Sequence, residues 1–317
     1  MENFFRSHLG EVHCATPAAP TGGGWIRCVT SISTPDGRTV AYSLYGEPGG
    51  VPVVFHSGSP GTRWKRPDVV RATEQCGIRL LAFDRPGYGE STRQVGRSVA
   101  DVVADVRLLA EALGWDRFAV AGGSGGGPHA LACAALMPDR VTRCAVVSGI
   151  APPLVDGPEP SEDEDDPRRN RTSWLAAHRG EAALRPGVEE TAREIMALIA
   201  AGGPEFPPDP HSPDGGAAGP PARDDADAMA RVRVRATFVD SHDGWVDDNL
   251  AFAQDWGFAL GGIEVAVSLW YGSADERGRR QAAHLAAAMP HASSHQSAGG
   301  HILNDAAYRR VLAWVSG

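Results

Sequence analysis

The sequence lacks the marks of a membrane-spanning protein and of a disulfide-stabilised one. Nowhere do about 18 apolar residues run together, the length that a transmembrane helix needs. The chain contains five cysteines that are scattered and form no C-x-x-C pair: Cys14, Cys28, Cys76, Cys133 and Cys144. Neither a disulfide framework nor a zinc knuckle is therefore indicated, and we expect free thiols in a reducing compartment.

The N-terminal segment lacks the pattern of a secretion signal, because no basic region is followed by an apolar one. We therefore expect a cytoplasmic protein. Residues 1–24 are rich in Pro, Gly and Ala and show no sustained hydrophobic periodicity. This composition predicts a flexible N-terminal tail.

Positive charge is scarce as well. The formal net charge is −9 at pH 7, and the isoelectric point is near 5.6. Nucleic acids and anionic membranes are bound by cationic surfaces, whereas this surface would repel them. A small neutral or amphiphilic molecule is the expected partner, and the composition does not indicate an oligomeric state.

What the sequence does contain is an alternation of strands and helices. Pro35-Asp36-Gly37-Arg38 is a turn sequence between two β-rich runs, which predicts a hairpin of 27–33 and 39–45. Further strands are predicted at 51–55, 79–83, 118–121, 143–148 and 265–271, and helices at 66–76, 99–113, 125–137 and 302–315. This alternation is typical of a doubly wound α/β sheet whose site lies at the carboxyl ends of the strands.

The alternation breaks between residues 150 and 262. This stretch holds an acidic run at 161–166, a helical segment at 188–201, a Pro/Gly-rich linker at 202–221 and an aromatic, helical stretch at 245–258. We interpret 150–262 as a lid inserted into a core made of 25–149 and 263–317. The acidic run is interpreted as a solvated loop, as blocks of like charge usually are.

Gly122-Gly123-Ser124-Gly125-Gly126 satisfies the pattern G-x-S-x-G directly after a buried strand and at the start of a helix. A serine on such a turn is strained, needs small neighbours and exposes its Oγ at a helix N-terminus. This context predicts that Ser124 is a nucleophile. The alternatives are a flexible glycine-rich turn and a dinucleotide-binding loop, but no acidic residue ends a following strand about 20 residues later.

Two segments together resemble the serine-nucleophile branch of the α/β-hydrolase superfamily. They are GGSGGGPHALACAALMPDRV at 122–141 and Asp84-Arg85-Pro86-Gly87-Tyr88-Gly89-Glu90-Ser91, the D-R-P-G-Y-G-x-S pattern after a strand. The resemblance covers about 26–150 and 263–317. It implies an α/β-hydrolase fold: a mostly parallel central sheet with an N-terminal hairpin, helices on both faces and an inserted helical lid. It also implies the chain order nucleophile, acid, histidine.

A serine nucleophile needs a general base, which is usually histidine. His301, in Ser297-Ala298-Gly299-Gly300-His301, stands between the last predicted strand and the final helix, where the family carries its base. His291 and His295 are alternatives whose H-x-x-x-H spacing is also compatible with a metal, but no third ligand of matching context is evident. We therefore predict His301 as the base and no metal.

Asp275 is the predicted acid that orients His301. It follows the strand 265–271 and resembles the family's G-x-x-D loop. The family's Val-Pro after the aspartate is replaced here by 276–280, the sequence ERGRR. The alternative is a surface aspartate paired with one of these arginines.

The N–H groups of Ser59 and Gly125 are the predicted donors of an oxyanion hole. Ser59 lies in the loop 55–61, which resembles H-G-x-P-G with Ser57 in place of the family's histidine and His56 one position earlier. Candidate substrate-binding residues are His56, Ser57, Trp245, Phe252 and Trp256, although the three aromatic residues equally fit packing within the lid. His129 is interpreted as a helix residue and not as a base.

These residues predict hydrolysis of an ester or related acyl compound, small and apolar or amphiphilic, through an acyl-enzyme on Ser124. Neither a metal nor an organic cofactor is required. A cyclase, a lyase and a cofactor-free perhydrolase on the same fold are alternatives, because fold does not fix chemistry. A ligand-binding, receptor-like protein with a residual triad is a further alternative. Epoxide hydrolases and haloalkane dehalogenases are disfavoured, because their elbow presents Asp.

Overall fold

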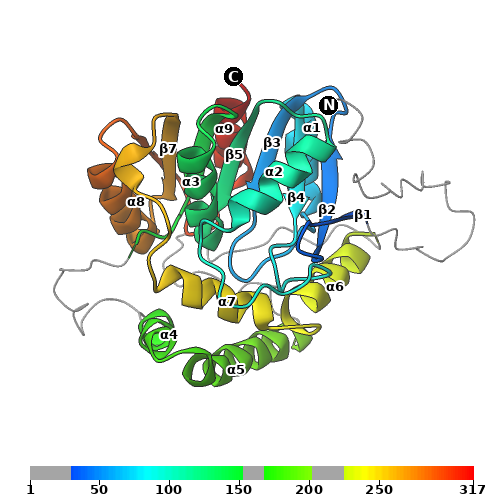
Figure 1. Ribbon diagram of the computed structural model, residues 1–317, viewed down its shortest axis with the longest axis vertical. Coiled ribbons are helices and arrows are strands. Elements are labelled where there is room, and N and C mark those ends of the chain that lie inside the picture. The colour runs from blue at the N-terminus through cyan, green and yellow to red at the C-terminus, as the bar shows by residue number, and fades with distance from the viewer. Residues whose placement is uncertain (1–29, 153–167, 202–224) are drawn as a thin grey trace, which may run out of the picture.

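The computed structural model describes residues 30–152, 168–201 and 225–317, and of 168–172 and 225–231 only the helical backbone. In these ranges an eight-stranded sheet has the order β1-β2-β4-β3-β5-β6-β7-β8 (Figure 1). The strands are β1 (Thr30–Ser33), β2 (Thr39–Gly46), β3 (Val51–His56), β4 (Ile78–Phe83), β5 (Phe118–Gly123), β6 (Val141–Val147), β7 (Ala266–Gly272) and β8 (Ser293–Ser297). The predicted tail, acidic run and linker lie outside the described residues.

The sheet is mostly parallel, as predicted. β1 and β2 form the expected antiparallel hairpin, and β2 also pairs antiparallel with β4. Every other pair between neighbouring strands is parallel. Because the carboxyl ends of parallel strands meet at one edge, the segments after β3, β5, β7 and β8 converge there.

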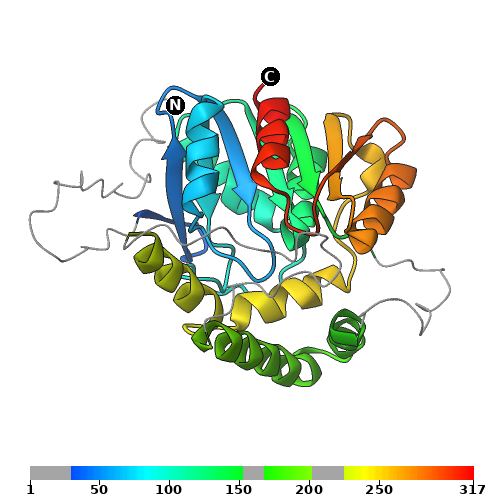
Figure 2. The same ribbon diagram turned by 180° about the vertical axis from the view of Figure 1, so that it is seen from behind.

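Helices cover both faces of the sheet. α1 (Pro67–Gln75) and α9 (Asp305–Ser316) lie on one face, and α2 (Val102–Ala112), α3 (Gly127–Leu136) and α8 (Glu276–Ala288) lie on the other (Figures 1 and 2). Alternate residues of a strand point to opposite faces, so that Val54 packs with the α2–α3 side and Val53 with the α9 side. The prediction of a doubly covered sheet is confirmed.

In the described parts of the segment between β6 and β7, four α-helices gather at the carboxyl edge of the sheet (Figure 2). They are α4 (Arg168–His178), α5 (Glu181–Ala200), α6 (Asp225–Phe238) and α7 (Asp243–Phe252). Leu184, Val188 and Val246 belong to a hydrophobic cluster of their own. α7 lies against the core, where the Gly244 N–H donates to the Gly87 carbonyl at 3.0 Å. The helices therefore lie where the sequence predicts a lid.

The prediction of a helical stretch over 245–258 was wrong in its second half. α7 ends at Phe252, and the side chain of Asp255 accepts a hydrogen bond from the Gly257 N–H at 2.8 Å. This hydrogen bond from the backbone to a side chain stabilises a tight turn, so the helix does not continue. Gly257 in that turn adopts a φ of 82°. Trp256 consequently enters the main hydrophobic cluster with only 3% of its surface exposed.

In the described ranges, no helix is both long and apolar enough to cross a membrane. Three cysteines are described, Cys76, Cys133 and Cys144, and all three are free thiols. The predicted free state of Cys14 and Cys28 lies outside the described residues.

Candidate active site

Ser124 lies on a sharp turn between β5 and α3. Its φ of 49° is in the left-handed region, which costs a non-glycine residue conformational energy and is a frequent property of functional residues. Glycines make the turn possible: a Cβ on Gly122 would lie 2.5 Å from the carbonyl carbon of Gly126, and one on Gly126 would lie 2.7 Å from the Ser57 oxygen. The small residues that the sequence pattern requires are therefore sterically obligatory.

Asp275 and His301, the predicted acid and base, are hydrogen-bonded to each other. Oδ2 of Asp275 and Nδ1 of His301 are 3.0 Å apart. Burial alone would raise the pKa of Asp275. The hydrogen bond and charge interaction with His301, together with the hydrogen bond from the Gly278 N–H, lower this pKa to about 2. With Nδ1 donating to the carboxylate, Nε2 is the ring nitrogen whose lone pair can accept a proton.

The departure from the family's Val-Pro sequence has a structural explanation. Asp275 is the N-cap of α8 and accepts a hydrogen bond from the Gly278 N–H at 2.7 Å. Glu276, and not Asp275, pairs with Arg279, at 2.8 Å. The sequence ERGRR thus forms the first turn of a helix, and Asp275 remains directed at His301.

The loops that carry Asp275 and His301 are fastened to each other. The Ala274 N–H donates to the Gly299 carbonyl at 2.9 Å, and the Ser273 N–H donates to the Ser297 carbonyl at 2.7 Å. Both loops follow neighbouring parallel strands, β7 and β8, and the Ser124 turn follows β5 at the same edge. The edge therefore presents a strained serine and an ordered Asp-His pair.

The loop after β3 packs directly on this turn. A Cβ on Gly125 would lie 3.1 Å from the backbone nitrogen of Ser59, and one on Gly58 would lie 3.6 Å from the Cβ of Ser124. Within the described part of the chain, the Ser59 N–H donates to no other group. Ser59 and Gly125 thus lie side by side, as two donors to one oxyanion require.

Comparison with known proteins agrees with this fold. A family model described as alpha/beta hydrolase fold matches residues 51–179. The enol-lactonase from Burkholderia xenovorans superposes with a TM-score of 0.60 at 19% identity, over 90% of this chain and 100% of that one. The chain therefore has the α/β-hydrolase fold, and residues 51–179 are similar to the α/β-hydrolase family.

Curated relatives of this α/β-hydrolase chain are similar over a shorter span. A non-heme chloroperoxidase from Streptomyces lividans is 34% identical over 127 residues, which is 39% of this chain and 46% of that protein. A proline iminopeptidase from Xanthomonas citri is 37% identical over 108 residues, which is 33% of this chain and 34% of that protein. The chain thus matches less than half the length of either relative.

Most candidate substrate-binding residues are buried in packed positions, and their contact with substrate stays a prediction. His56 is 1% exposed and stacks on His129, with ring centroids 6.2 Å apart. Phe252 and Trp256 belong to the main hydrophobic cluster, and Trp245 packs among the inserted helices. For the three aromatic residues, this packing favours the alternative that the sequence left open.

Ser57, the remaining candidate, is buried and supports the loop after β3. Its Oγ donates to the Thr62 carbonyl at 2.7 Å and accepts from Nζ of Lys65 at 2.5 Å. The ammonium group of Lys65 also lies 4.5 Å from the centre of the Phe55 ring. Ser57 in place of the family's histidine therefore leaves this loop supported from within.

Lys65 gives a prediction about pH. Burial lowers its pKa from 10.5 to about 7, so the unfolded chain binds one proton more than the native one between these values. Stability should therefore rise with pH in this window, by about 2 kcal/mol from pH 7 to pH 9. Urea unfolding at the two pH values measures this rise, and Lys65→Met should remove it.

Lys65 is the only lysine of the chain, so its titration can be followed without assignment. A protein carrying ¹⁵N-lysine should show a single Nζ titration with its midpoint near pH 7. A midpoint near the ordinary value of 10.5 would contradict the burial of the ammonium group.

The histidine pair considered as a metal site does not assemble one. The ring of His295 stacks on Trp270 at 4.2 Å, and its Nε2 lies 2.9 Å from Oγ of Ser293. Among the residues that the structure describes, no group of three or more His, Cys, Asp or Glu side chains could hold a metal ion.

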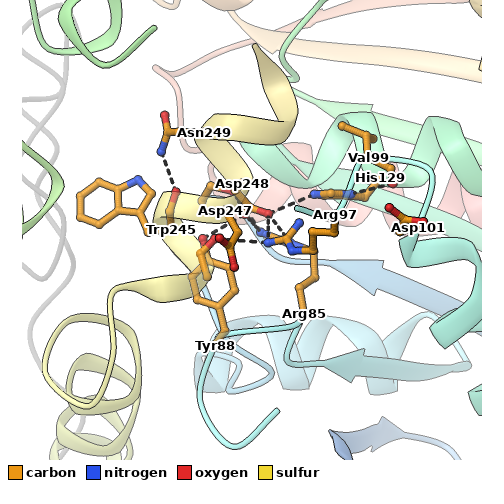
Figure 3. A network of polar contacts seen from close by, with 12 residues as sticks. Arg85, Tyr88, Arg97, Val99, Asp101, His129, Trp245, Asp247, Asp248 and Asn249 are labelled. Atoms are coloured by element: carbon orange, nitrogen blue, oxygen red, sulfur yellow. Dashed lines mark hydrogen bonds and ion pairs between the residues drawn. The ribbon is translucent and has the colours of Figure 1, made fainter. Parts of the chain in front are cut away.

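Sequence reasoning missed a buried cluster of charges around Asp248 of α7. Its carboxylate is 0% exposed and binds Arg85, Arg97, Tyr88, His129 and Ser59 (Figure 3). Burial alone would raise the pKa of Asp248, but the charges of Arg85 and Arg97 hold it well below its ordinary value. In the sequence, the one sign of this cluster was Arg85 within the D-R-P-G-Y-G motif, and the motif does not indicate the partner of Arg85.

Proposed function

We propose that this α/β-hydrolase chain cleaves a carboxylic ester, or a related acyl compound, through an acyl-enzyme on Ser124. The observation that carries the proposal is the Asp275–His301 hydrogen bond of 3.0 Å at the same sheet edge as the strained Ser124. A pair of this kind supplies the base that a serine hydroxyl lacks.

In the proposed reaction, Oγ of Ser124 attacks the acyl carbon while Nε2 of His301 takes the hydroxyl proton. The carbonyl oxygen becomes an oxyanion that accepts hydrogen bonds from the N–H groups of Ser59 and Gly125. His301 then returns the proton to the departing alcohol, and the acyl-enzyme remains. Water attacks this intermediate with His301 again as the base, releasing the acid and restoring Ser124.

We propose a small apolar or amphiphilic substrate in the cytoplasm. The helices α4 to α7 lie over the site, and helices in this place exclude water from the reacting groups. The net charge of −9 opposes an anionic macromolecule as substrate. The division of the chain into a core of 25–149 and 263–317 and a lid of 150–262 belongs to the same proposal.

Labelling with a fluorophosphonate tests the proposed nucleophile without knowledge of the substrate. Phosphonates react with serines whose hydroxyl is activated by a base. We expect one adduct per chain, on the peptide that contains Ser124, and none in Ser124→Ala. An unlabelled native protein, or an adduct only on another serine, would overturn the proposal. A panel of esters of varied acyl length then defines the substrate class.

A second candidate is perhydrolysis, which the similarity to a non-heme chloroperoxidase favours. Here hydrogen peroxide would replace water as the nucleophile that attacks the acyl-enzyme, giving a peracid and free Ser124. Incubation with an ester and hydrogen peroxide distinguishes the two. A peracid yield that exceeds the carboxylic acid supports perhydrolysis, and acid alone supports hydrolysis.

A further inference from the structure

The buried Asp248 cluster joins α7 to the loop that carries the proposed oxyanion donor. Figure 3 shows the Asp248 carboxylate at its centre, pointing from α7 toward Arg85, Arg97 and His129. Nη2 of Arg85 donates to Oδ2 of Asp248 at 2.6 Å, and both side chains are 1% exposed or less. Such a pair is costly to bury unless further hydrogen bonds satisfy it.

Arg85 makes those further bonds to the loop after β3. Its Nη1 donates to the Ser57 carbonyl at 2.5 Å, and its Nη2 donates to the Gly58 carbonyl at 2.9 Å. The Oγ of Ser59 accepts from Arg85 at 3.0 Å and donates to the Asp248 carboxylate. Three consecutive residues of the loop are therefore held by one buried ion pair.

The hydrogen bond to the Gly58 carbonyl determines where the Ser59 N–H points. These two groups belong to one planar peptide unit, which is trans here, so they point in opposite directions. When Arg85 fixes the carbonyl on one side, the N–H is fixed on the other. The Ser59 nitrogen lies near Gly125, the second proposed donor, since a Cβ added to Gly125 would lie 3.1 Å from it.

We propose that Arg85, held by Asp248, is a positioning residue that fixes the peptide plane carrying the Ser59 N–H. It touches neither the substrate nor the reacting atoms. Because Asp248 lies on α7, the oxyanion hole is complete only when this helix is docked on the core. This inference rests on the proposed acyl transfer, since it assigns Ser59 its role there.

Arg85→Lys tests the proposal, because lysine keeps the positive charge beside Asp248 but cannot reach two carbonyls and a carboxylate together. The measurement is the second-order rate of fluorophosphonate labelling at Ser124, which an oxyanion hole accelerates, together with kcat and KM on an ester. Loss of a complete donor costs about 100- to 1000-fold, so we expect a displaced donor to slow labelling and kcat about 10- to 100-fold. KM should change less than threefold.

Arg93→Lys is the matched control. Arg93 pairs with Asp247, the neighbour of Asp248 on α7, at 2.8 Å, and it also pairs with Glu181 of α5 at 2.9 Å. It fastens the same helix to the same part of the core without touching residues 57–59. We expect its labelling rate and kcat within twofold of the native protein. An equal loss in both variants would show that helix docking alone matters and would overturn the proposal.

Asp248→Asn keeps the experiment decisive if Arg85→Lys fails to fold. It keeps the size of the side chain on α7 but removes the charge that holds the Arg85 guanidinium against the loop. Slower labelling of folded Asp248→Asn supports the proposal, and labelling at the native rate overturns it. If the native protein is labelled at Ser124 and folded Arg85→Lys is labelled at the same rate, the positioning role alone is overturned. Native protein that is not labelled overturns the proposed function as well.

Discussion

Ser124→Ala should reduce ester turnover by about 10⁴- to 10⁶-fold, because no other hydroxyl occupies the turn between β5 and α3. The backbone of Ser124 is held in a left-handed conformation, with φ of 49°, and the residue opens the short helical turn that follows. Alanine lacks the nucleophile but fits the same space. The residual rate would come from the oxyanion donors and substrate binding alone. Initial rates on an ester that the native protein hydrolyses measure the loss.

The fold should survive this substitution, since the Ser124 hydroxyl makes no hydrogen bond that stabilises the turn to any residue within the described ranges. A melting temperature within a few degrees of the native value checks this. Ser294→Ala, at an exposed position of β8, serves as the control for loss of a serine hydroxyl and should keep full activity. Turnover by Ser124→Ala at the native rate would remove Ser124 from the mechanism.

The turn that carries Ser124 was predictable from the sequence because all that it requires lies within a few consecutive residues. A buried strand, a serine flanked by glycines and a helix fix the turn locally, and the steric limits at Gly122 and Gly126 explain why no other residues fit. The hairpin at Pro35-Asp36-Gly37 was predictable for the same reason, because its turn is formed by consecutive residues. Asp275 and His301 were accessible through chain order, since each follows a late strand.

The Asp248 cluster was not predictable, because its members are far apart in the chain. Arg85 and Asp248 are 163 positions apart, and nothing near either of them indicates the other. A charged residue on a helix is usually solvated, so Asp248 has no local sign of burial. The helical prediction over the aromatic residues was wrong at its end for a related reason. Near-helical spacing predicted that Trp256 lies in the helix, whereas α7 ends at Phe252 and Trp256 packs in the main hydrophobic cluster.

Asp275→Asn should lower kcat about 10⁴-fold while Ser124 and the oxyanion donors stay in place. Asparagine presents an NH₂ group as readily as an oxygen, so it no longer selects the His301 tautomer whose Nε2 accepts the serine proton. It also cannot stabilise the imidazolium that forms. Steady-state kinetics of the variant measure the loss, and a phosphonate adduct on Ser124 should form correspondingly slowly.

The acid limb of the pH profile provides an independent check on Asp275. Its pKa is depressed from 3.8 to about 2, so its stabilising charge is fully present above pH 3.8 and is lost only as pH falls through 2. Between pH 4 and pH 8 the deficit of Asp275→Asn in stability should therefore stay constant. Glu276→Gln, at the exposed neighbour that pairs with Arg279, should keep native kcat. Native kcat in Asp275→Asn would show that another group orients His301.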